Sequence, residues 1–516
     1  MGVVEPGNVL ERRKKMSDYL SHIFAFDSSH PLLFTQLYFW VFLAIVYTGF
    51  ALVVGKTRGR MHLRNVYLMV VSAFFYYKTS GNALGILVFL TVSNWILGLG
   101  LGRTDKKWQR GLILATGVLT DLGILCYWKY AYFALDIWNT LTGENLTIAE
   151  KIILPVGISF YTFQTISYIV DVYRRQVEPL SNVLDFGFYV SFFPQLVAGP
   201  IVRASEFIPQ LYRPFFLGRR QFGIAVFWIL NGLLKKIILS DYLAVNFVDR
   251  VFDSPMLFSG AENAMALLVY SMQVYADFSG YTDIAIGVAM LMGFYLPVNF
   301  NSPYKARNPQ EFWRRWHCSL SRWLKSYVYI PLGGNRTILG HKAPKLLAGN
   351  VNSFATMLIG GLWHGASWNF IIWGALNGVG MIVAKCFPWK IWRPLAVVMT
   401  FVFISFTRLF FRASSNLDPD GASQQAWETA KMMLGQITGA WNNAIIPQFL
   451  WEYRTVMLLF AAGMAIHWLP TKVKRWYRIN FALLPLPLIL VAVVVAVFIA
   501  NYFVTSDLQP FIYFQF

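Results

Sequence analysis

The chain has 516 residues, of which 56% are hydrophobic and only 13% are charged, against about 25% charged in an ordinary soluble domain. Its formal net charge is +19. Apolar stretches of about 20 residues, enough to cross a bilayer core about 30 Å thick, recur along almost the whole length. This pattern excludes a soluble enzyme with a single buried helix.

The hydropathy pattern predicts an all-α, polytopic membrane protein with about ten to fourteen membrane helices in one domain. The clearest apolar stretches are 32–54, 83–100, 111–132, 222–239, 369–384, 395–411, 456–469 and 482–504. Three further stretches carry polar residues, glycines or prolines, namely 66–77, 152–172 and 264–294. We expect these three to be tilted, broken or re-entrant, which is tolerated only where protein or water satisfies the backbone.

The basic residues gather in short loops between the apolar stretches, at 56–64, 103–110, 203–220 and 305–345. This is the positive-inside pattern, so we expect these loops on the cytoplasmic side, facing membrane lipids rather than nucleic acid. The three cysteines, Cys126, Cys318 and Cys386, are too few for a disulfide framework. None has a partner at metal-ligand spacing, so no metal site is predicted.

Residues 305–345 differ from the other basic loops because aromatic residues alternate with the charges. They contain nine Lys or Arg residues and a single acid, Glu311. Read at 100° per residue, the segment predicts an amphipathic helix in the membrane interface. Its apolar face would carry Trp313, Trp316, Leu320, Trp323, Leu324 and Tyr327, and its basic face Arg314, Arg315, Arg322 and Lys325. The basic face could anchor the helix to lipid phosphates or hold an anionic cofactor at the mouth of a site.

His364 stands out among the seven histidines because it lies in GGLWHGASWNFIIWG, residues 360–374, a run of glycines and large apolar residues. An ionisable residue at membrane depth must face a cavity or a partner. The neighbouring glycines suit either a tunnel wall or tight helix packing, so a catalytic and a packing role both stay open. His317 falls at the edge of the apolar face and can point into the protein, whereas Cys318 falls on the basic face.

Two acids lie in the apolar stretch YADFSGYTDIAIG, at Asp277 and Asp283. Six residues apart on a helix, they point to opposite faces, so a carboxylate pair sharing one proton is not expected. We expect each to bind backbone groups near Gly280, and a proton relay in a transporter is the alternative. Transporters commonly contain internal repeats, and none is visible here. P-loop, His-Glu-x-x-His and Gly-x-Ser-x-Gly motifs are also absent from the sequence.

Several motifs resemble those of the membrane-bound O-acyltransferases, most closely the branch that contains the bacterial alginate O-acetylation membrane protein. Their sequences are LPVGISFYTFQTISYIVDVYR at 154–174, FFPQLVAGPIVR at 192–203, DFSGYTDIAIG at 277–287, NFNSPY and FWRRWHCSLSRWL within 299–324, YIPLGGNR at 329–336 and GGLWHGASWNFIIWG. The co-occurrence of RRWH and GLWHG is the most specific part of this resemblance.

The resemblance implies helices around a central tunnel, with His364 as the catalytic residue and His317 lining the route or positioning a thioester. A neutral imidazole that accepts the proton of an attacking hydroxyl accelerates acyl transfer by about 10² to 10⁴. The donor would be acetyl-coenzyme A or another acyl thioester, used as a substrate without any permanently bound cofactor. Its phosphates would bind the four residues of the basic face.

The C-terminal hexapeptide FIYFQF resembles a motif whose tyrosine carries the acyl group in related O-acylation systems, which implies this role for Tyr513. An aromatic belt at the membrane interface is the other interpretation. We divide the chain into a polar segment at 1–30 with no visible signal peptide, a membrane domain at 31–510 with a signature core at 150–375, and the motif at 511–516.

Together these features predict an O-acyltransferase of the bacterial inner membrane that delivers an acetyl group to an exported polysaccharide or cell-wall polymer. We expect a secreted or membrane-anchored acetyltransferase of the SGNH type as its partner, since the loop at 414–443 is too short to grip a polymer. Direct acylation of a lipid or protein is the alternative within the enzyme class, and an ion-coupled transporter is the alternative outside it.

Overall fold

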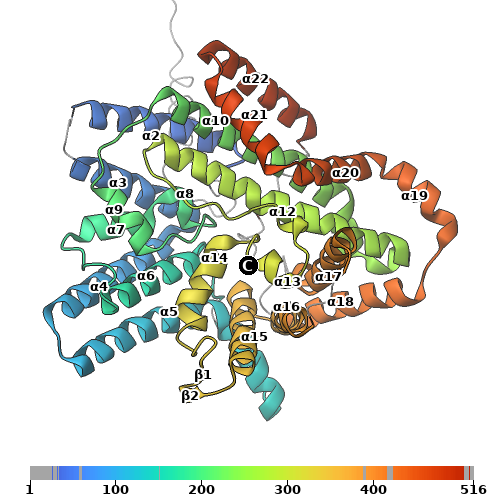
Figure 1. The fold of residues 1–516 in the computed structure, drawn as a ribbon, viewed down its shortest axis with the longest axis horizontal. Coiled ribbons are helices and arrows are strands. Elements are labelled where there is room, and N and C mark those ends of the chain that lie inside the picture. Colours follow the sequence, from blue (N-terminus) through green and yellow to red (C-terminus); the bar gives the residue numbers. More distant parts are fainter. Residues whose placement is uncertain are drawn as a thin grey trace, which may run out of the picture.

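The computed structural model describes residues 26, 32, 34–56, 61–149, 151–387, 391–414, 422–504 and 511. Within this part of the chain the secondary structure is helical except for one small hairpin, β1 (Thr337–Ile338) and β2 (His341–Lys342). The predicted all-α class is therefore confirmed (Figure 1). Eight of the described helices are long and apolar enough to cross a membrane, or nine if a pair bent by 80° counts as one span. This count lies below the ten to fourteen that hydropathy predicts.

The first half of the chain forms a bundle on the left of Figure 1. It comprises α2 (Leu37–Lys56), α3 (Met61–Ser80), α4 (Leu84–Arg103), α5 (Lys107–Thr142), α6 (Ile158–Tyr173), α7 (Val183–Ser191), α8 (Phe193–Leu196) and α9 (Ala204–Leu211). Its core is rich in buried phenylalanine and tyrosine. Lipid-facing apolar side chains on α2 to α5 remain exposed, as expected for membrane helices.

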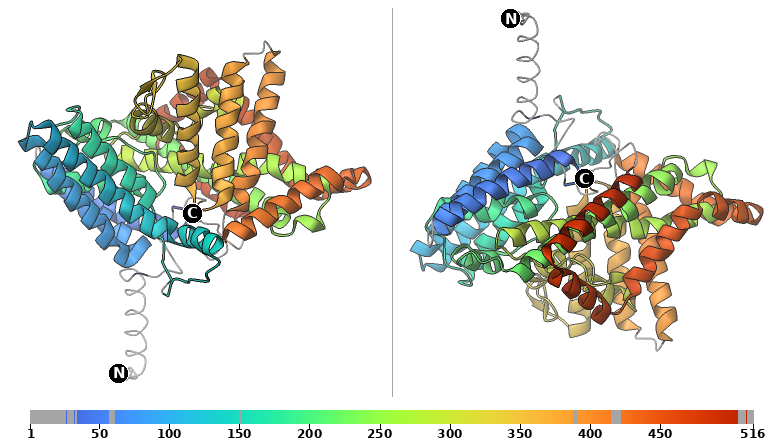
Figure 2. Two further views of the ribbon diagram at one scale, coloured as in Figure 1. Left: turned by 90° about the horizontal axis from the view of Figure 1, so that it is seen from below. Right: turned by 90° about the horizontal axis from the view of Figure 1, so that it is seen from above.

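The second half begins with α10 (Arg219–Leu234), which continues through the π-helical segment η2 (Lys235–Asp241) and packs along the long helix α12 (Gly260–Leu291). Between and beyond them lie η3 (Ala244–Val248), α11 (Asp249–Asp253), α13 (Pro309–Trp313), α14 (Cys318–Leu324), η6 (Lys325–Tyr329), α15 (Lys345–His364), α16 (Trp368–Cys386), α17 (Arg393–Ala413), α18 (Ala422–Gly439), α19 (Ile446–Glu452), α20 (Arg454–Trp468), α21 (Thr471–Leu483) and α22 (Leu486–Phe503). Helices α15, α16 and α17 run side by side (Figure 2).

Three boundaries differ from the sequence prediction. Helix α12 runs unbroken through 264–294 up to Leu291, whereas a tilted, broken or re-entrant span was expected there. Helix α15 was not predicted as a span, because Asn350, Asn352 and Thr356 lower its hydropathy. The stretch 482–504 is not one helix, since the chain turns between α21 and α22 just before Pro485.

The hydrophobic residues form two cores, and the RRWH and GLWHG motifs lie where these cores meet. Trp323 and Trp363 belong to the core of the first half, whereas Trp316 and Trp373 belong to the core of the second half. Consequently α13 and α14 face different cores although only a short turn joins them. Both histidines of the motifs, His317 and His364, lie at this junction.

Candidate active site

His364 is the last residue of α15 and lies in a cage of aromatic rings. Its side chain is buried, with ring centroids 4.8 Å from Trp363, 5.1 Å from Trp373 and 5.2 Å from Phe411. The helix ends here because the next residue, Gly365, adopts an extended conformation that leads into α16. The sequence thus places the histidine at a helix end between two packed membrane helices.

The glycines around His364 serve helix packing, one of the two roles that the sequence left open. A Cβ atom at Gly361 would clash with the carbonyl oxygen of Phe370, and one at Gly374 would lie 2.6 Å from that of Met357. These close approaches bring the backbones of α15 and α16 together, as small residues do in membrane helix pairs. They fix the position of the helix end that carries His364.

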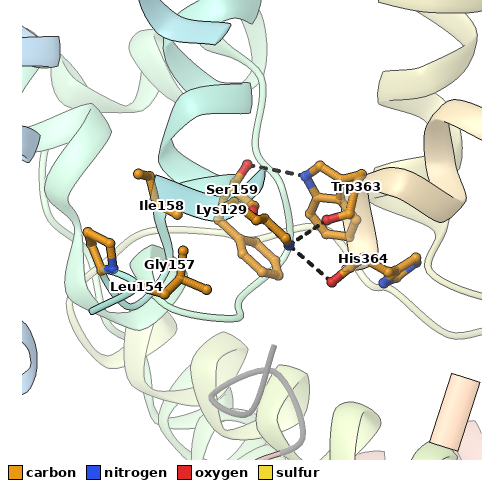
Figure 3. A pocket seen from close by; sticks show the side chains of 9 residues that line it. Lys129, Leu154, Gly157, Ile158, Ser159, Trp363 and His364 are labelled. Carbon is orange, nitrogen blue, oxygen red and sulfur yellow. Dashed lines mark hydrogen bonds between the residues drawn. The ribbon is translucent and has the colours of Figure 1, made fainter. Parts of the chain in front are cut away.

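Two neighbouring side chains of α5, Lys129 and Tyr130, hold the end of α15, and neither was predicted as a site residue; Figure 3 shows the bonds of Lys129. The Lys129 ammonium donates to the backbone oxygens of Trp363 at 2.7 Å and His364 at 3.0 Å, and to the Ser159 hydroxyl at 3.3 Å. The Tyr130 hydroxyl donates to the carbonyl of Leu362 at 2.6 Å. These groups satisfy carbonyls that every helix leaves without partners at its C-terminus. The lone lysine within the apolar stretch 111–132 was the available signal.

Two cavities reach His364, and it is the residue that their linings share. One is lined by Lys129, Leu154, Pro155, Gly157, Ile158, Ser159, Phe160, Trp363 and His364. The other is lined by Val274, Phe312, Trp313, Trp316, His364, Trp373, Asn377, Ile404, Thr407, Arg408 and Phe411. Each has a volume of about 20 Å³, close to the space of one water molecule. The ring therefore borders small spaces that belong to different sets of helices.

His317 packs against the same tryptophan as His364. Its ring is fully buried, with centroids 6.0 Å from Trp363 and 4.6 Å from Phe278. Burial lowers the pKa of His317 to about 3, so this imidazole is neutral at physiological pH. Trp363 is thus a ring neighbour of both signature histidines.

The prediction of one continuous amphipathic helix around His317 was wrong. The helix breaks between α13 and α14, and His317 itself adopts a left-handed conformation with φ of 42°. A non-glycine residue in this region is strained and persists only where its surroundings hold it. The break lets α13 and α14 reach different cores while keeping the ring of His317 between them.

The basic face lies apart from the two cavities. Arg314, Arg322 and Lys325 are exposed, and none of the four predicted cofactor-binding residues lines a cavity at His364. Arg315 pairs with Glu311 at 2.8 Å and Arg322 pairs with Glu206 at 3.2 Å. The structure therefore confirms that these side chains point away from the buried tryptophans. A role in binding phosphate stays a prediction.

The two acids of α12 lie in ion pairs with consecutive lysines of the π-helical segment η2. Asp283 accepts from Lys235 at 2.6 Å and from Asn231 at 2.6 Å. Lys236 donates to Asp277 at 2.6 Å and also lies 2.7 Å from Asp241. Backbone partners near Gly280 were expected for both acids, because the sequence does not show that η2 packs against α12. Charge at membrane depth is here neutralised within the protein.

Tyr513 lies outside the described residues. The first residue of its hexapeptide, Phe511, is described and buried, with its ring 4.9 Å from that of Tyr281 and 4.5 Å from the Lys236 ammonium. Among the residues that the structure describes, no group of His, Cys, Asp and Glu side chains could hold a metal ion.

The comparisons with known proteins agree with these motifs. The sequence model of the membrane-bound O-acyltransferase family matches residues 114–388, which include both histidines. The chain is 37% identical to a peptidoglycan O-acetyltransferase of Helicobacter pylori, over 74% of this chain and 77% of that protein. It is 37% identical to a probable alginate O-acetylase of Pseudomonas aeruginosa, over 75% of each chain. A teichoic acid D-alanyltransferase of Bacillus subtilis is 25% identical, over 72% of this chain and 96% of that protein.

Proposed function

Since the chain belongs to the membrane-bound O-acyltransferase family, we propose that it transfers an acetyl group from a cytoplasmic thioester toward hydroxyl groups of an exported polymer. Membership of this family makes it a multi-pass membrane O-acyltransferase. The names of its relatives give peptidoglycan, alginate and teichoic acid as acceptors, all of which are polymers. Two of these names specify acetyl as the transferred group, which supports acetyl here.

The observation that carries this proposal is the position of His364 between two cavities. An acyl donor that enters through one set of helices and an acceptor that enters through the other would meet at this imidazole. The ring accepts the proton of the attacking hydroxyl, the hydroxyl oxygen bonds to the acyl carbon, and the departing thiolate takes the proton back. His317 lines neither cavity, and its neutral ring packs against Trp363, so its role here is to position the tryptophan beside His364.

The small cavities favour a short acyl chain. The cavity beside Trp373 and Phe411 has no long apolar extension in its lining and suits an acetyl group better than a fatty acyl chain. Acetyl-coenzyme A on the cytoplasmic side is the donor that fits the basic loops, with Arg314, Arg315, Arg322 and Lys325 receiving its phosphates. We place the protein in the bacterial inner membrane, working with a secreted or anchored acetyltransferase of the SGNH type.

The test compares wild type with His364→Ala in a bacterium that lacks its own copy of the gene. Cells receive labelled acetate, and ester-linked label is measured in the polymer, lipid and membrane-protein fractions at matched abundance. We expect label in the polymer with wild type and none with His364→Ala. His467→Ala is the matched control, because His467 is buried near the end of α20, accepts a hydrogen bond from the Tyr304 backbone and lines neither of the cavities at His364.

Each outcome of this experiment discriminates between the interpretations. Label in lipid or membrane protein instead of polymer would assign the enzyme to direct acylation of those acceptors. Label in the polymer only when labelled D-alanine replaces labelled acetate would show that the transferred group is D-alanyl and not acetyl. Undiminished polymer acetylation by His364→Ala would remove His364 from the mechanism.

A further inference from the structure

Arg408 is a buried cation that lines one of the two cavities at His364 and that none of the motifs includes. It lies in the membrane helix α17, its side chain is 5% exposed, and it lines the same cavity as His364, Trp316 and Asn377. No carboxylate of a described residue lies within ion-pair distance of it, whereas Arg412, one turn further on, pairs with Asp249 at 2.8 Å. A buried charge without a counter-ion is costly, so its retention at membrane depth points to a function.

The hydrogen bonds of Arg408 leave part of the guanidinium available. Nη1 donates to the backbone oxygen of Ser271 at 2.9 Å and to the Tyr304 hydroxyl at 2.6 Å. Nε and Nη2 donate to no atom of the described residues. Because a guanidinium carries five N–H donors in a fixed plane, two bonds from Nη1 hold this plane while other donors stay unused.

Aromatic rings orient the guanidinium in the cavity wall. Its central carbon lies 4.2 Å from the ring centre of Trp316, with the rings of Tyr304 and Phe312 at 5.5 Å and 5.9 Å. Trp316 and Phe312 line the same cavity. Arginine tolerates such stacking because its guanidinium is planar and weakly hydrated. The charge is therefore held at a fixed place next to a space shared with His364.

We propose that Arg408 binds the carbonyl oxygen of the acyl group and stabilises the oxyanion that forms on it during transfer. This rests on the proposed function, since it assigns the electrophilic half of the same reaction. As the acceptor oxygen bonds to the acyl carbon, the carbonyl electron pair moves onto the carbonyl oxygen and His364 takes the acceptor proton. When the intermediate collapses, the carbonyl re-forms, the carbon–sulfur bond breaks and the thiolate takes the proton from His364. Arg408 donates hydrogen bonds throughout and transfers no proton.

The lining of the cavity selects this ligand over a phosphate. Seven of the eleven residues that line it are apolar and Arg408 is the one arginine or lysine among them, a lining that matches a small acyl group with one polar oxygen better than a phosphate with its four oxygens. The apolar lining suits a methyl group, and the remaining donors of Arg408 suit a single oxygen. A preorganised donor aimed at a developing oxyanion contributes about 10² to 10³ to turnover.

The experiment measures kcat and KM for transfer of label from radioactive acetyl-coenzyme A by membranes containing each variant at matched abundance. For Arg408→Gln we expect kcat to fall about 100-fold with KM within about threefold of wild type. Arg408→Lys keeps the positive charge but presents its donors in a different geometry, so its kcat should lie between those of wild type and Arg408→Gln.

The matched control is the double variant Arg412→Gln with Asp249→Asn. It removes a buried arginine of the same helix together with its partner, leaves no uncompensated charge and does not alter the cavity lining. We expect its kcat to stay within about threefold of wild type. Melting temperature in detergent confirms that each variant is folded.

Arg408→Gln with a kcat within about threefold of wild type would overturn the oxyanion role. A loss shared equally by Arg408→Gln and the control would also overturn it, because disturbance of α17 would then explain both. A wild-type protein that transfers no label from acetyl-coenzyme A would instead overturn the proposed donor. Failure of this inference and failure of the proposed function thus give different results.

Discussion

Replacing Lys129 by Met removes the ammonium that joins α5 to the helix end carrying His364. Met retains the length and apolar bulk of the lysine stem but cannot donate a hydrogen bond. The backbone oxygens of Trp363 and His364, now bound at 2.7 and 3.0 Å, would lose their donor. We therefore expect His364 to lose its fixed position relative to the two cavities.

The effect on stability should be smaller than the effect on turnover. Two buried carbonyls left without partners cost about 1–3 kcal/mol each, or about 2–6 kcal/mol together. Lys129 is half-buried, and removing an ammonium that has no carboxylate partner among the described residues returns a few kcal/mol. The two contributions largely offset each other, and we expect a net loss of about 1–2 kcal/mol in the free energy of unfolding. A displacement of the catalytic group by about 1 Å lowers turnover by about 100-fold.

The assay is transfer of labelled acetyl groups by membranes with matched amounts of protein, together with the melting temperature in detergent. Tyr130→Phe is the comparison variant, because it removes one neutral hydrogen bond to Leu362 and leaves the bond to His364 in place. We expect Tyr130→Phe to lose about 1 kcal/mol of stability and to keep most of its turnover. Equal turnover per folded molecule in wild type and Lys129→Met would refute the reasoning.

Three further predictions concern residues that the sequence singles out. Tyr513→Phe should abolish polymer acetylation at unchanged protein abundance if the phenol carries the acyl group, and mass spectrometry of the C-terminal peptide from labelled wild type should show an acetylated Tyr513. Arg314→Gln combined with Arg315→Gln should raise the KM for acetyl-coenzyme A about tenfold, equivalent to about 1.4 kcal/mol, with a smaller change in abundance; an equal fall in both quantities would favour a lipid anchor. Because burial lowers the pKa of His317, the unfolded chain binds a proton there before the folded protein does, so stability falls as pH decreases from about 6.5, the unfolded value. His317→Phe should have a melting temperature that falls less than that of wild type between pH 7 and pH 5, and a parallel decrease in both proteins would contradict this.

The sequence predicts the helices better than their breaks. Long apolar stretches such as 111–132 and 395–411 correspond to α5 and α17, because hydropathy reports transfer into lipid directly. The break at His317 was not predicted, because the hydrophobic periodicity continues through it. The helix breaks there because α13 and α14 pack into different hydrophobic cores. Helix α15 was not predicted because its polar residues lower the hydropathy of the stretch. In the structure these residues bind other parts of the protein and are not exposed to lipid. Asn352, for example, donates to the backbone oxygens of Gly334 and Thr337.

The candidate site shows a similar division between local and long-range information. His317 and His364 can be found from short motifs, and the structure places both against Trp363. Lys129 and Arg408 cannot be found in this way, because their importance arises only when α5 and α17 pack around the end of α15. Each is a single basic residue in an apolar stretch, and no local pattern connects it with a histidine more than forty positions away in the chain.

Charge at membrane depth separates into two groups in the described part of this protein. Lys235 and Lys236 lie against the carboxylates of Asp283 and Asp277, so the low dielectric around them is compensated by an opposite charge. Lys129 and Arg408 have no such carboxylate among the described residues, and both line cavities that reach His364. The carboxylate of an ion pair largely cancels the electrostatic attraction between its cation and a negatively charged substrate atom. A cation bound only to carbonyls, hydroxyls and aromatic faces keeps this attraction and can stabilise developing negative charge. Arg64 and Arg110 are also buried without a carboxylate at ion-pair distance among the described residues, but they line neither cavity. On this physical ground Lys129 and Arg408, rather than the ion-paired lysines, are the cations expected to act on the acyl group.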